Sequence, residues 1–462
     1  MSGRRGIGAL SRSAKDGILG ALRQTPKPEG RIEVPPTPRP ARKRNDKFAD
    51  FPELKDLKTQ QAVADLLGVA NPFFREHDGC AGATTDIDGK THINFASYNY
   101  LGLNGHPAVA AAAKAAIDKY GVSVSASRLV AGERPIHREL ERRIADYYGV
   151  ESAVVFVSGH ATNVAAIGHL LRPKDLVIYD SLAHNSIVVG AALSGATRRL
   201  FPHNDLDGLE EILIQHAHSH ERVLVAVEGL YSMDGDFPDL ARLVKLRDRY
   251  GFWLMVDEAH SLGVLGKTGR GVSEECGVDP REIDIWMGTL SKTLSGCGGF
   301  IAGSAALVEY LKFTAPGFVY SVGMPPAVAA AAIACFDLLD QEPERVAKLR
   351  ANGVRFVEKA REAGLDTGSS TGLAIVPVMV GDSLRAVHLS NRLLERGVNA
   401  LPIVHPAVPE RSARLRFFIT ADHTFEQIDE AVAVTAEEHA GLAKAGFGIK
   451  MAAALAKATR PS

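Results

Sequence analysis

The sequence predicts an α/β protein with a mainly parallel sheet, followed by a smaller α+β domain. Three observations support this. The chain has 462 residues, enough for two or three packed subdomains. From about residue 90, short β-rich runs alternate with longer helical patterns, which is typical of a parallel sheet covered by helices on both faces. After Pro325 this alternation ends, and long helical stretches precede two further strands.

The elements are expected in the following order along the chain. The expected strands are Ala153–Val157, Leu176–Tyr179, Val223–Val227, Phe252–Val256, Ile283–Met287 and Gly299–Ala302, with later strands near Ala374–Val380 and Leu415–Ile419. The expected helices are Ile136–Tyr148, Ala161–Leu171, Pro238–Tyr250, Pro326–Leu339 and Glu344–Ala363.

These patterns divide the chain into five segments. We expect a basic N-terminal extension that is disordered or amphipathic, an N-terminal arm, a large α/β domain, a C-terminal α+β domain and a tail. Their expected bounds are 1–47, 48–105, 106–325, 326–445 and 446–462.

The composition indicates a soluble, cytoplasmic protein. Mean hydropathy is −0.01, and no apolar run reaches the roughly 18–20 residues that span a bilayer. The four cysteines have no CxxC spacing, so the sequence indicates neither a disulfide framework nor a metal site. No nucleic-acid partner is expected.

The net charge of −1 conceals an asymmetry between the two parts of the chain. Residues 1–47 contain 12 Lys/Arg and 4 Asp/Glu, a net charge of +8, which leaves −9 on the remainder. A basic extension on an acidic body can bind an anionic partner, such as the inner face of a membrane or an acidic acyl carrier protein. A solvated, disordered leader explains the same pattern, and both interpretations stay open.

Four polar motifs follow expected strands, where α/β sheets bind their ligands. They are Ser158-Gly159-His160, Asp180-Ser181-Leu182-Ala183-His184, Asp257-Glu258-Ala259-His260 and Gly288-Thr289-Leu290-Ser291-Lys292. Each alone is compatible with helix capping, a surface lysine or a buried structural histidine. Together they offer phosphate donors, a histidine for a ring face, a carboxylate for a ring nitrogen and an amine for an aldehyde. That combination indicates pyridoxal phosphate.

Nine sequence blocks carry a resemblance to a known family. They are NFASYNYLGL (94–103), SRLVAGERPIHRELE (127–141), FVSGHATN (156–163), DSLAHNS (180–186), VEGLYSMDGD (227–236), MVDEAHSLGVLGKTGRG (255–271), GTLSKTLSGCGG (288–299), YSVGMPP (320–326) and ARLRFFITADHT (413–424). Over roughly residues 72–440 the chain resembles the α-oxoamine synthases, which are fold-type I pyridoxal-phosphate enzymes.

The resemblance implies a role for each motif residue. Lys292 would bond the cofactor aldehyde and later act as the base, and Asp257 would pair with the ring nitrogen. His184 would stack on the ring, and His260 would hydrogen-bond its phenolic oxygen. The implied cofactor-binding residues are Ser158, Gly159, His160, His184, Ser232, Asp257, His260, Thr289, Ser291, Lys292 and Ser321. The implied substrate-binding residues are Asn99, Arg416, Arg414 and His405, with Arg416 as the main carboxylate ligand and Arg414 as the fallback.

Some positions depart from the family pattern. His160 replaces the usual aromatic Tyr or Phe, and Ser321 alone keeps a hydroxyl in the stretch that reaches a partner's phosphate in relatives. His405 follows a valine where some relatives have arginine, and Ala407 replaces a substrate-binding threonine. These departures concern the substrate more than the cofactor.

The expected reaction is a decarboxylative condensation of an amino acid with an acyl thioester, carried out by a homodimer. YNYLGL (98–103) and the basic extension favour L-serine and a long-chain thioester, as in serine palmitoyltransferase and the first step of sphingolipid synthesis. The alternative is glycine or alanine with another thioester, as in aminooxononanoate synthase or a polyketide-associated enzyme. The thiol donor, CoA or acyl carrier protein, stays open. Other classes considered are a fold-type I aminotransferase and a non-enzymatic scaffold.

Overall fold

The computed structural model describes residues 47–409 and 411–447, so the basic extension and most of the tail lie outside the described residues. The chain divides into two units, residues 1–59 and 60–462. The described part of the first unit holds a 3-10 helix, η2 (Phe48–Asp50), and the first turns of α2 (Pro52–Leu66).

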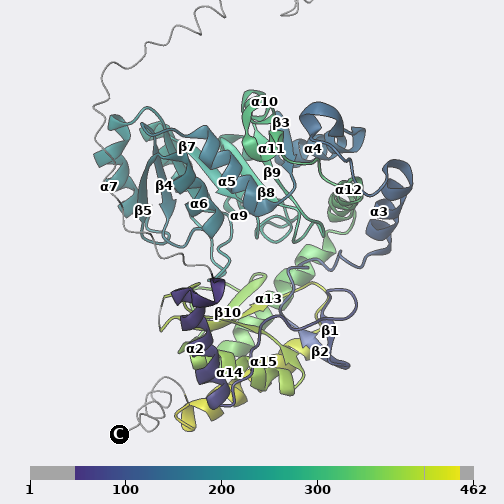
Figure 1. Ribbon diagram of the computed structural model, residues 1–462, viewed down its shortest axis with the longest axis vertical. Coiled ribbons are helices and arrows are strands. Elements are labelled where there is room, and N and C mark those ends of the chain that lie inside the picture. Colours follow the sequence, from purple (N-terminus) through teal and green to yellow (C-terminus); the bar gives the residue numbers. More distant parts are fainter. Residues whose placement is uncertain (1–46, 410, 448–462) are drawn as a thin grey trace, which may run out of the picture. The chain divides into compact units, whose positions relative to one another are not determined.

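A seven-stranded mixed sheet forms the centre of the large domain (Figure 1). Its strand order is β3-β9-β8-β7-β6-β4-β5, and only β9 runs antiparallel to its two neighbours. The bounds are β3 (Ser152–Phe156), β4 (Leu176–Asp180), β5 (Thr197–Phe201), β6 (Val223–Glu228), β7 (Trp253–Asp257), β8 (Ile285–Thr289) and β9 (Gly299–Gly303).

The central strands are buried on both faces, as helices on both sides of a parallel sheet require. Alternate residues of one strand belong to different cores. Val177 and Tyr179 of β4 pack in one apolar cluster, whereas Leu176 and Ile178 pack in the other. Because side chains alternate between the faces of a strand, each face must have its own helical cover.

The helices of the large domain cover the two faces of this sheet or pack against the covering helices, as α3 packs against α12 (Figure 1). They are α3 (Pro107–Tyr120), α4 (Pro135–Tyr148), α5 (Gly159–Leu170), α6 (Asn185–Ser194), α7 (Leu206–His216), α8 (Leu240–Tyr250), α9 (Val272–Cys276), α10 (Ala305–Thr314), α11 (Pro316–Val319) and α12 (Pro326–Gln341). Short turns of other helix types are η3 (Arg128–Gly132), η4 (Ala217–Ser219) and η5 (Pro280–Glu282).

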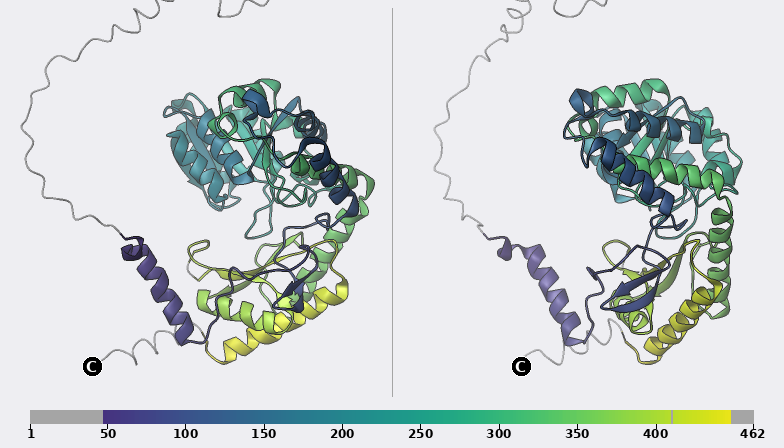
Figure 2. Two further views of the ribbon diagram at one scale, coloured as in Figure 1. Left: turned by 45° about the vertical axis from the view of Figure 1, so that its right-hand side comes forward. Right: turned by 90° about the vertical axis from the view of Figure 1, so that its right-hand side faces the viewer.

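The C-terminal domain has its own antiparallel sheet of order β10-β13-β12. Its elements are α13 (Glu344–Glu362), β10 (Ile375–Gly381), α14 (Ser383–Glu395), β11 (Val398–Asn399), β12 (Leu401–Ile403), β13 (Ala413–Phe418) and α15 (Phe425–Lys444). β1 (Thr84–Ile87) pairs with β2 (Lys90–Asn94), and β2 pairs with β11, so this dark-blue hairpin lies among the green and yellow C-terminal elements (Figure 2).

The predicted fold class is confirmed, including the parallel sheet, the helices on both faces and the smaller C-terminal domain. Edge strand β5 was not predicted, because three of its five residues are exposed and Arg198 and Arg199 conceal any apolar run. The two-residue β11 and the short β12 were also missed. Only pairing with distant segments makes these stretches strands.

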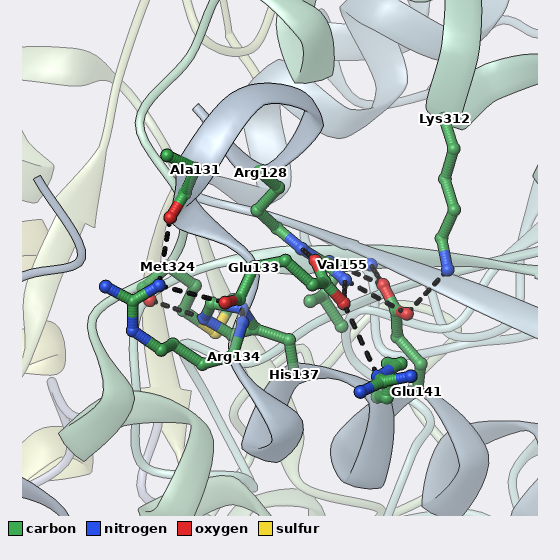
Figure 3. Close-up of polar contacts among 10 residues, drawn as sticks. Arg128, Ala131, Glu133, Arg134, His137, Glu141, Val155, Lys312 and Met324 are labelled. Carbon is green, nitrogen blue, oxygen red and sulfur yellow. Dashed lines mark hydrogen bonds and ion pairs between the residues drawn. The ribbon is translucent and has the colours of Figure 1, made fainter. Parts of the chain in front are cut away.

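A buried ion network fixes the turn before α4 (Figure 3). Arg128 donates to Glu133 at 2.6 Å and to Glu141 at 2.6 Å, and Lys312 donates to Glu141 at 2.6 Å. Glu141 also accepts the backbone N–H of Val155 in β3 at 3.0 Å. Since the Arg128 and Glu141 side chains are only 4% and 5% exposed, each charge depends on the other for compensation.

We expect Arg128→Met to lower the free energy of unfolding by about 3–5 kcal/mol, because it leaves the Glu141 carboxylate buried without its main partner. Urea titration followed by circular dichroism measures the change. The matched control is Arg138→Met, which removes an arginine 72% exposed and 3.9 Å from Glu133 and should change stability by at most about 0.5 kcal/mol. Equal losses in both variants would contradict a special role for the buried network.

Candidate active site

The four predicted motifs converge at the carboxyl ends of the parallel strands. Asp257 is the last residue of β7, Thr289 is the last residue of β8, and the motif of His184 follows β4. One cavity brings them together. It is lined by Gly159, His160, Asn163, His184, Ser186, Glu228, Asp257, Ala259, His260, Met287, Thr289 and Lys292.

Lys292 lies three residues beyond the end of β8, in the loop that leads to β9. Burial lowers the pKa of Lys292 to about 8, and the carboxylates of Asp257 and Glu228 offset only part of this effect. Its ammonium group lies 5.8 Å from the centroid of the Tyr98 ring. A lysine amine with a lowered pKa is a competent nucleophile near neutral pH.

The reactivity of this amine should depend on pH. In the cofactor-free protein, we expect the rate of Lys292 reductive methylation to rise as pH passes through about 8, because only the neutral amine is nucleophilic. Peptide mass spectrometry at several pH values measures the rate for each lysine. Exposed Lys267 serves as the internal reference, and indistinguishable pH profiles for the two lysines would contradict the lowered pKa.

Asp257 is held rigidly although it is only 3% exposed. Its Oδ1 accepts the N–H of Ala259 at 2.9 Å, and its Oδ2 accepts the side-chain amide of Asn163 at 2.7 Å. A buried carboxylate with two fixed donors has one defined orientation. The group can therefore present its charge to a cationic ring nitrogen in the cavity.

His260 is buried and hydrogen-bonded to a tyrosine. Its Nδ1 lies 2.6 Å from the hydroxyl of Tyr100, burial raises the pKa of Tyr100 well above its ordinary value, and burial lowers the pKa of His260 well below its own. Both groups are therefore neutral. Because no other acceptor for the Tyr100 hydrogen lies among the described residues, the hydroxyl donates to Nδ1. The imidazole hydrogen must then sit on Nε2, which makes His260 a neutral donor.

The start of α5 forms a compact cradle. Ser158 caps the helix by accepting the N–H of Ala161 at 3.3 Å, and among the described residues the backbone N–H groups of Gly159 and His160 have no acceptor. A Cβ on Gly159 would lie 2.6 Å from Thr289 Oγ1, so only glycine allows this approach to β8. Thr289 Oγ1 in turn lies 3.2 Å from the Ser291 hydroxyl. The cluster suits a phosphate.

The two candidate arginines of β13 have different surroundings. Arg414 is paired with Asp234 at 2.5 Å and donates to the carbonyl of Met233. Arg416 donates to the carbonyl of Ser232 at 3.0 Å, its Nε is buried without a partner, and in the described part of the chain no carboxylate pairs with it. Its guanidinium lies 4.4 Å from the Phe418 ring centroid. Arg416 is thus the arginine left able to bind an anion.

Several predicted residues lie outside this constellation. The side chain of Asn99 is engaged by the carbonyl of Ala81 and the N–H of Asn104. His405 is exposed on the turn after β12, and among the described residues it has no hydrogen bond to another candidate. Ser321 lines a small separate cavity beside Arg128. Ser232 is buried and meets Arg416 through its carbonyl oxygen.

Three residues of the site were missed from sequence, namely Asn163, Glu228 and Tyr100. Glu228 stands beside Asp257 in the register of β6 and β7, and burial together with Asp257 raises the pKa of Glu228 to about 8. Its Oε1 accepts the backbone N–H of His184 at 2.6 Å. All three lie within quoted motifs, but only their neighbours across the fold give them a role. The signal in the sequence that could have indicated them was a polar side chain next to apolar residues that were expected to be buried.

A second cavity, of about 700 Å³, lies at the opposite ends of the same strands. It is lined by Trp253 and Ile285, the first residues of β7 and β8, together with Tyr310 and a mixture of apolar and charged side chains. None of the predicted site residues lines it. In the described residues no group of His, Cys, Asp or Glu could hold a metal, and no helix is long and apolar enough to cross a bilayer.

Comparison with known proteins places these features in a family. Residues 90–434 match the model of the family "Aminotransferase class I and II". The chain is 40% identical to 8-amino-7-oxononanoate synthase 1 of Bacillus velezensis over 84% of this chain and 95% of that protein. It is 42% identical to the 8-amino-7-oxononanoate synthase of Symbiobacterium thermophilum over 76% and 89% of the two chains.

The backbone is also similar to that of several solved structures. Serine palmitoyltransferase of Sphingomonas wittichii superposes with a TM-score of 0.81 at 30% identity, over 86% of this chain and 99% of that one. A serine palmitoyltransferase structure that contains PLP superposes with a TM-score of 0.82 at 30% identity, over the same shares of the two chains. The 8-amino-7-oxononanoate synthase of Francisella tularensis gives 0.66 at 27% identity, over 75% and 97%.

Fold, site and relatives define a pyridoxal-phosphate-dependent enzyme of fold-type I. Within that class the chain belongs to the α-oxoamine synthases and is an acyltransferase. The predicted family is therefore confirmed. The finer prediction of a serine palmitoyltransferase is not, because the two curated relatives described above, at 40% and 42% identity, are 8-amino-7-oxononanoate synthases.

The residues present fit pyridoxal phosphate. The cavity offers an amine of lowered pKa at Lys292, a braced carboxylate at Asp257 and a neutral N–H donor at His260. The glycine cradle at Gly159 and the hydroxyl of Thr289 suit the phosphate. Each part of the cofactor has a complementary group on one chain.

Proposed function

We propose that the protein binds pyridoxal phosphate at Lys292 and condenses a small amino acid, alanine or glycine, with an acyl thioester. The observation that carries this proposal is the convergence of Lys292, Asp257 and His260 on one cavity in a chain about 40% identical to 8-amino-7-oxononanoate synthases. In the compound of that name, the amino-bearing carbon carries one methyl group. Alanine that has lost its carboxylate supplies such a fragment.

The bound cofactor would withdraw the electron pair left at Cα when its proton is removed. The protein's residues would move the protons and orient the substrates. Lys292 takes the Cα proton, and a Cα–acyl bond forms as the thiol leaves. The Cα–carboxylate bond then breaks with release of carbon dioxide, and Cα regains a proton. The products are an α-amino ketone, carbon dioxide and a free thiol.

The remaining roles concern binding. Asp257 would keep the ring nitrogen protonated, and His260 would donate to the phenolic oxygen. The start of α5, with Gly159 and His160, and Thr289 would hold the phosphate. The guanidinium of Arg416, whose Nε has no hydrogen-bond partner among the described residues, would bind the substrate carboxylate through charge-assisted hydrogen bonds.

A second candidate is L-serine with a long-chain acyl thioester. It is favoured by the higher TM-scores to serine palmitoyltransferases, 0.81 and 0.82 against 0.66 for the oxononanoate synthase structure. These structural relatives are only 30% identical to the chain. Backbone similarity therefore favours the serine candidate, whereas the higher sequence identity favours alanine or glycine.

Substrate titrations distinguish the two candidates. The change in cofactor absorbance gives the dissociation constants of glycine, alanine and serine, and thiol release is then assayed with short and long acyl-CoA and acyl-carrier thioesters. We expect turnover with alanine or glycine to exceed turnover with serine by at least about tenfold. A clear preference for serine and a long chain would establish the second candidate.

The same assay can test whether the basic N-terminal extension helps to bind the thioester substrate. The basic extension, with its net charge of +8, would attract an acidic carrier protein or an anionic membrane. A chain that lacks residues 1–47 should then keep its amino-acid affinity but show a higher KM for the carrier-bound thioester at low salt. Equal KM values for both chains would assign the extension no part in delivery.

We also propose that the protein is a homodimer. Exposed apolar side chains gather on two segments tied together by a hydrogen bond from Ser127 Oγ to the carbonyl of Val319 at 2.7 Å. They are Leu129, Val130, Tyr320 and Val322, and Val130 and Tyr320 are 82% and 86% exposed. A second copy would cover them and bring Ser321 toward its partner's phosphate site.

Val130→Glu is expected to shift the monomer–dimer equilibrium at least about tenfold toward monomer, because it places a charge in an apolar interface. Analytical ultracentrifugation measures the equilibrium. Ile214→Glu, at an exposed apolar position on α7, is the control and should leave it unchanged. A fully active wild-type monomer at nanomolar concentration would contradict the proposal.

A further inference from the structure

Asp257 and His184 are joined by a chain of buried hydrogen bonds. The amide nitrogen of Asn163 donates to Asp257 Oδ2 at 2.7 Å and to the hydroxyl of Ser186 at 2.9 Å. That hydroxyl lies 2.7 Å from Nδ1 of His184. Asn163 and Ser186 are each only 1% exposed, so water does not compete for these bonds.

The orientation of the Asn163 amide follows from its neighbours. Its two N–H groups meet two acceptors, the Asp257 carboxylate and the Ser186 oxygen, while its Oδ1 is buried without a partner. The reversed amide would place Oδ1 against the carboxylate, which repels it. The charge of Asp257 therefore fixes the amide and leaves Oδ1 unsatisfied.

The direction of the next bond follows. Because the Ser186 oxygen already accepts from Asn163, and no other acceptor for its hydrogen lies among the described residues, the hydroxyl donates to Nδ1 of His184. The backbone N–H of Ser186 points at the same nitrogen from 3.3 Å. Two donors at Nδ1 require its lone pair, so the ring hydrogen sits on Nε2.

The state of the ring agrees with this bonding. Burial lowers the pKa of His184, and the charge of Lys292 lowers it further, although Asp257 acts in the opposite sense. The ring is thus neutral near pH 7. Its backbone is held as well, since the N–H of His184 donates to Glu228 Oε1 at 2.6 Å. Within the described chain, Nε2 has no partner.

We propose that Asn163 and Ser186 are positioning residues that hold His184 in the Nε2–H tautomer, so that a neutral N–H donor faces the carboxylate of the amino-acid substrate. This inference rests on the proposed function for the identity of the substrate group. The same Asn163 that braces the Asp257 carboxylate also fixes the tautomer of His184 through Ser186. One amide thereby couples the two sides of the site.

Nitrogen-15 NMR of the histidine side chains tests the tautomer directly, in the purified protein with and without pyridoxal phosphate. His184→Asn identifies the signals. We expect wild-type Nδ1 in the range of an unprotonated acceptor and Nε2 in the N–H range. Ser186→Ala should give a mixture of both tautomers, because only the longer contact from the backbone N–H of residue 186, at 3.3 Å, still favours Nε2–H. It should also raise the amino-acid dissociation constant about three- to tenfold, the effect of weakening one hydrogen bond, with a smaller change in kcat.

Ser194→Ala is the matched control. Ser194 is also a buried serine of α6, but its hydroxyl donates only to the carbonyl of Ala191. This variant should keep the wild-type His184 signals and amino-acid affinity. Asn163→Ala should resemble Ser186→Ala, since the hydroxyl then loses its fixed orientation.

Two outcomes would overturn the inference. They are a wild-type His184 with its hydrogen on Nδ1, or an unchanged tautomer in Ser186→Ala. The wild-type spectrum decides the first even if no variant folds. Failure of the proposed function would look different, because the cofactor-free protein would show the Nε2–H tautomer yet bind neither pyridoxal phosphate nor an amino acid.

Discussion

Lys292→Ala is expected to abolish turnover and to remove the absorbance band of lysine-bound cofactor, while the fold survives. Among the residues that line the cavity with Asp257 and His260, Lys292 is the lysine. Burial lowers its pKa to about 8, so a usable fraction is neutral near pH 7. Methyl replacement removes both the bond to the cofactor aldehyde and the base that takes the Cα proton.

Absorbance spectra, cofactor content after dialysis and thiol release measure these effects. Circular dichroism checks the fold. Lys267→Ala, at an exposed lysine outside the cavity, should behave like the wild type. An active Lys292→Ala enzyme with an unchanged spectrum would place the covalent bond at another residue and overturn the site.

Asp257→Asn is expected to retain bound cofactor but to lower kcat by at least about a hundredfold, the scale on which removal of one preorganised electrostatic partner acts. The substitution keeps size and shape, so the N–H of Ala259 can still find an oxygen. What it removes is the negative charge that would stabilise a protonated ring nitrogen. Without that proton, the ring withdraws the Cα electron pair poorly.

Single-turnover kinetics separate the loss in the chemical rate from any change in substrate binding. The pH dependence of the cofactor spectrum reports the protonation of the ring nitrogen. Asp175→Asn is the control, because Asp175 is equally buried but accepts the N–H of Arg172 at the other end of β4. A rate within a few-fold of wild type would show that Asp257 is not the partner of the ring nitrogen.

The order of the main strands and helices could be predicted because it depends on the local periodicity of apolar residues. The runs at Val223–Val227 and Phe252–Val256 are apolar enough to be buried on both faces, and both became strands. β5 could not be predicted in this way, since Thr197–Phe201 is mostly exposed and pairs only because β4 lies beside it. Edge strands depend on their neighbours more than on their own composition.

The candidate site shows the same division. Lys292, Asp257, His184 and His260 could be named because each is a reactive residue placed directly after a strand or within a motif of the family. The substrate residues could not be ranked. Arg414 and Arg416 lie two residues apart on β13, and only the tertiary pairing of Arg414 with Asp234 distinguishes them.

By itself, the sequence determined the fold class and the family, and it predicted the residues that would meet the cofactor. These depend on hydrophobic periodicity and on reactive groups at fixed places along the chain. The tertiary structure alone supplied the hydrogen-bond partners from which we infer the tautomers of His184 and His260. It also showed which arginine lacks a carboxylate partner among the described residues and that Glu228 lies against Asp257. The physical reason is that protonation states and hydrogen-bond directions depend on burial and on partners brought together from distant segments, as Tyr100 meets His260 across 160 positions of sequence.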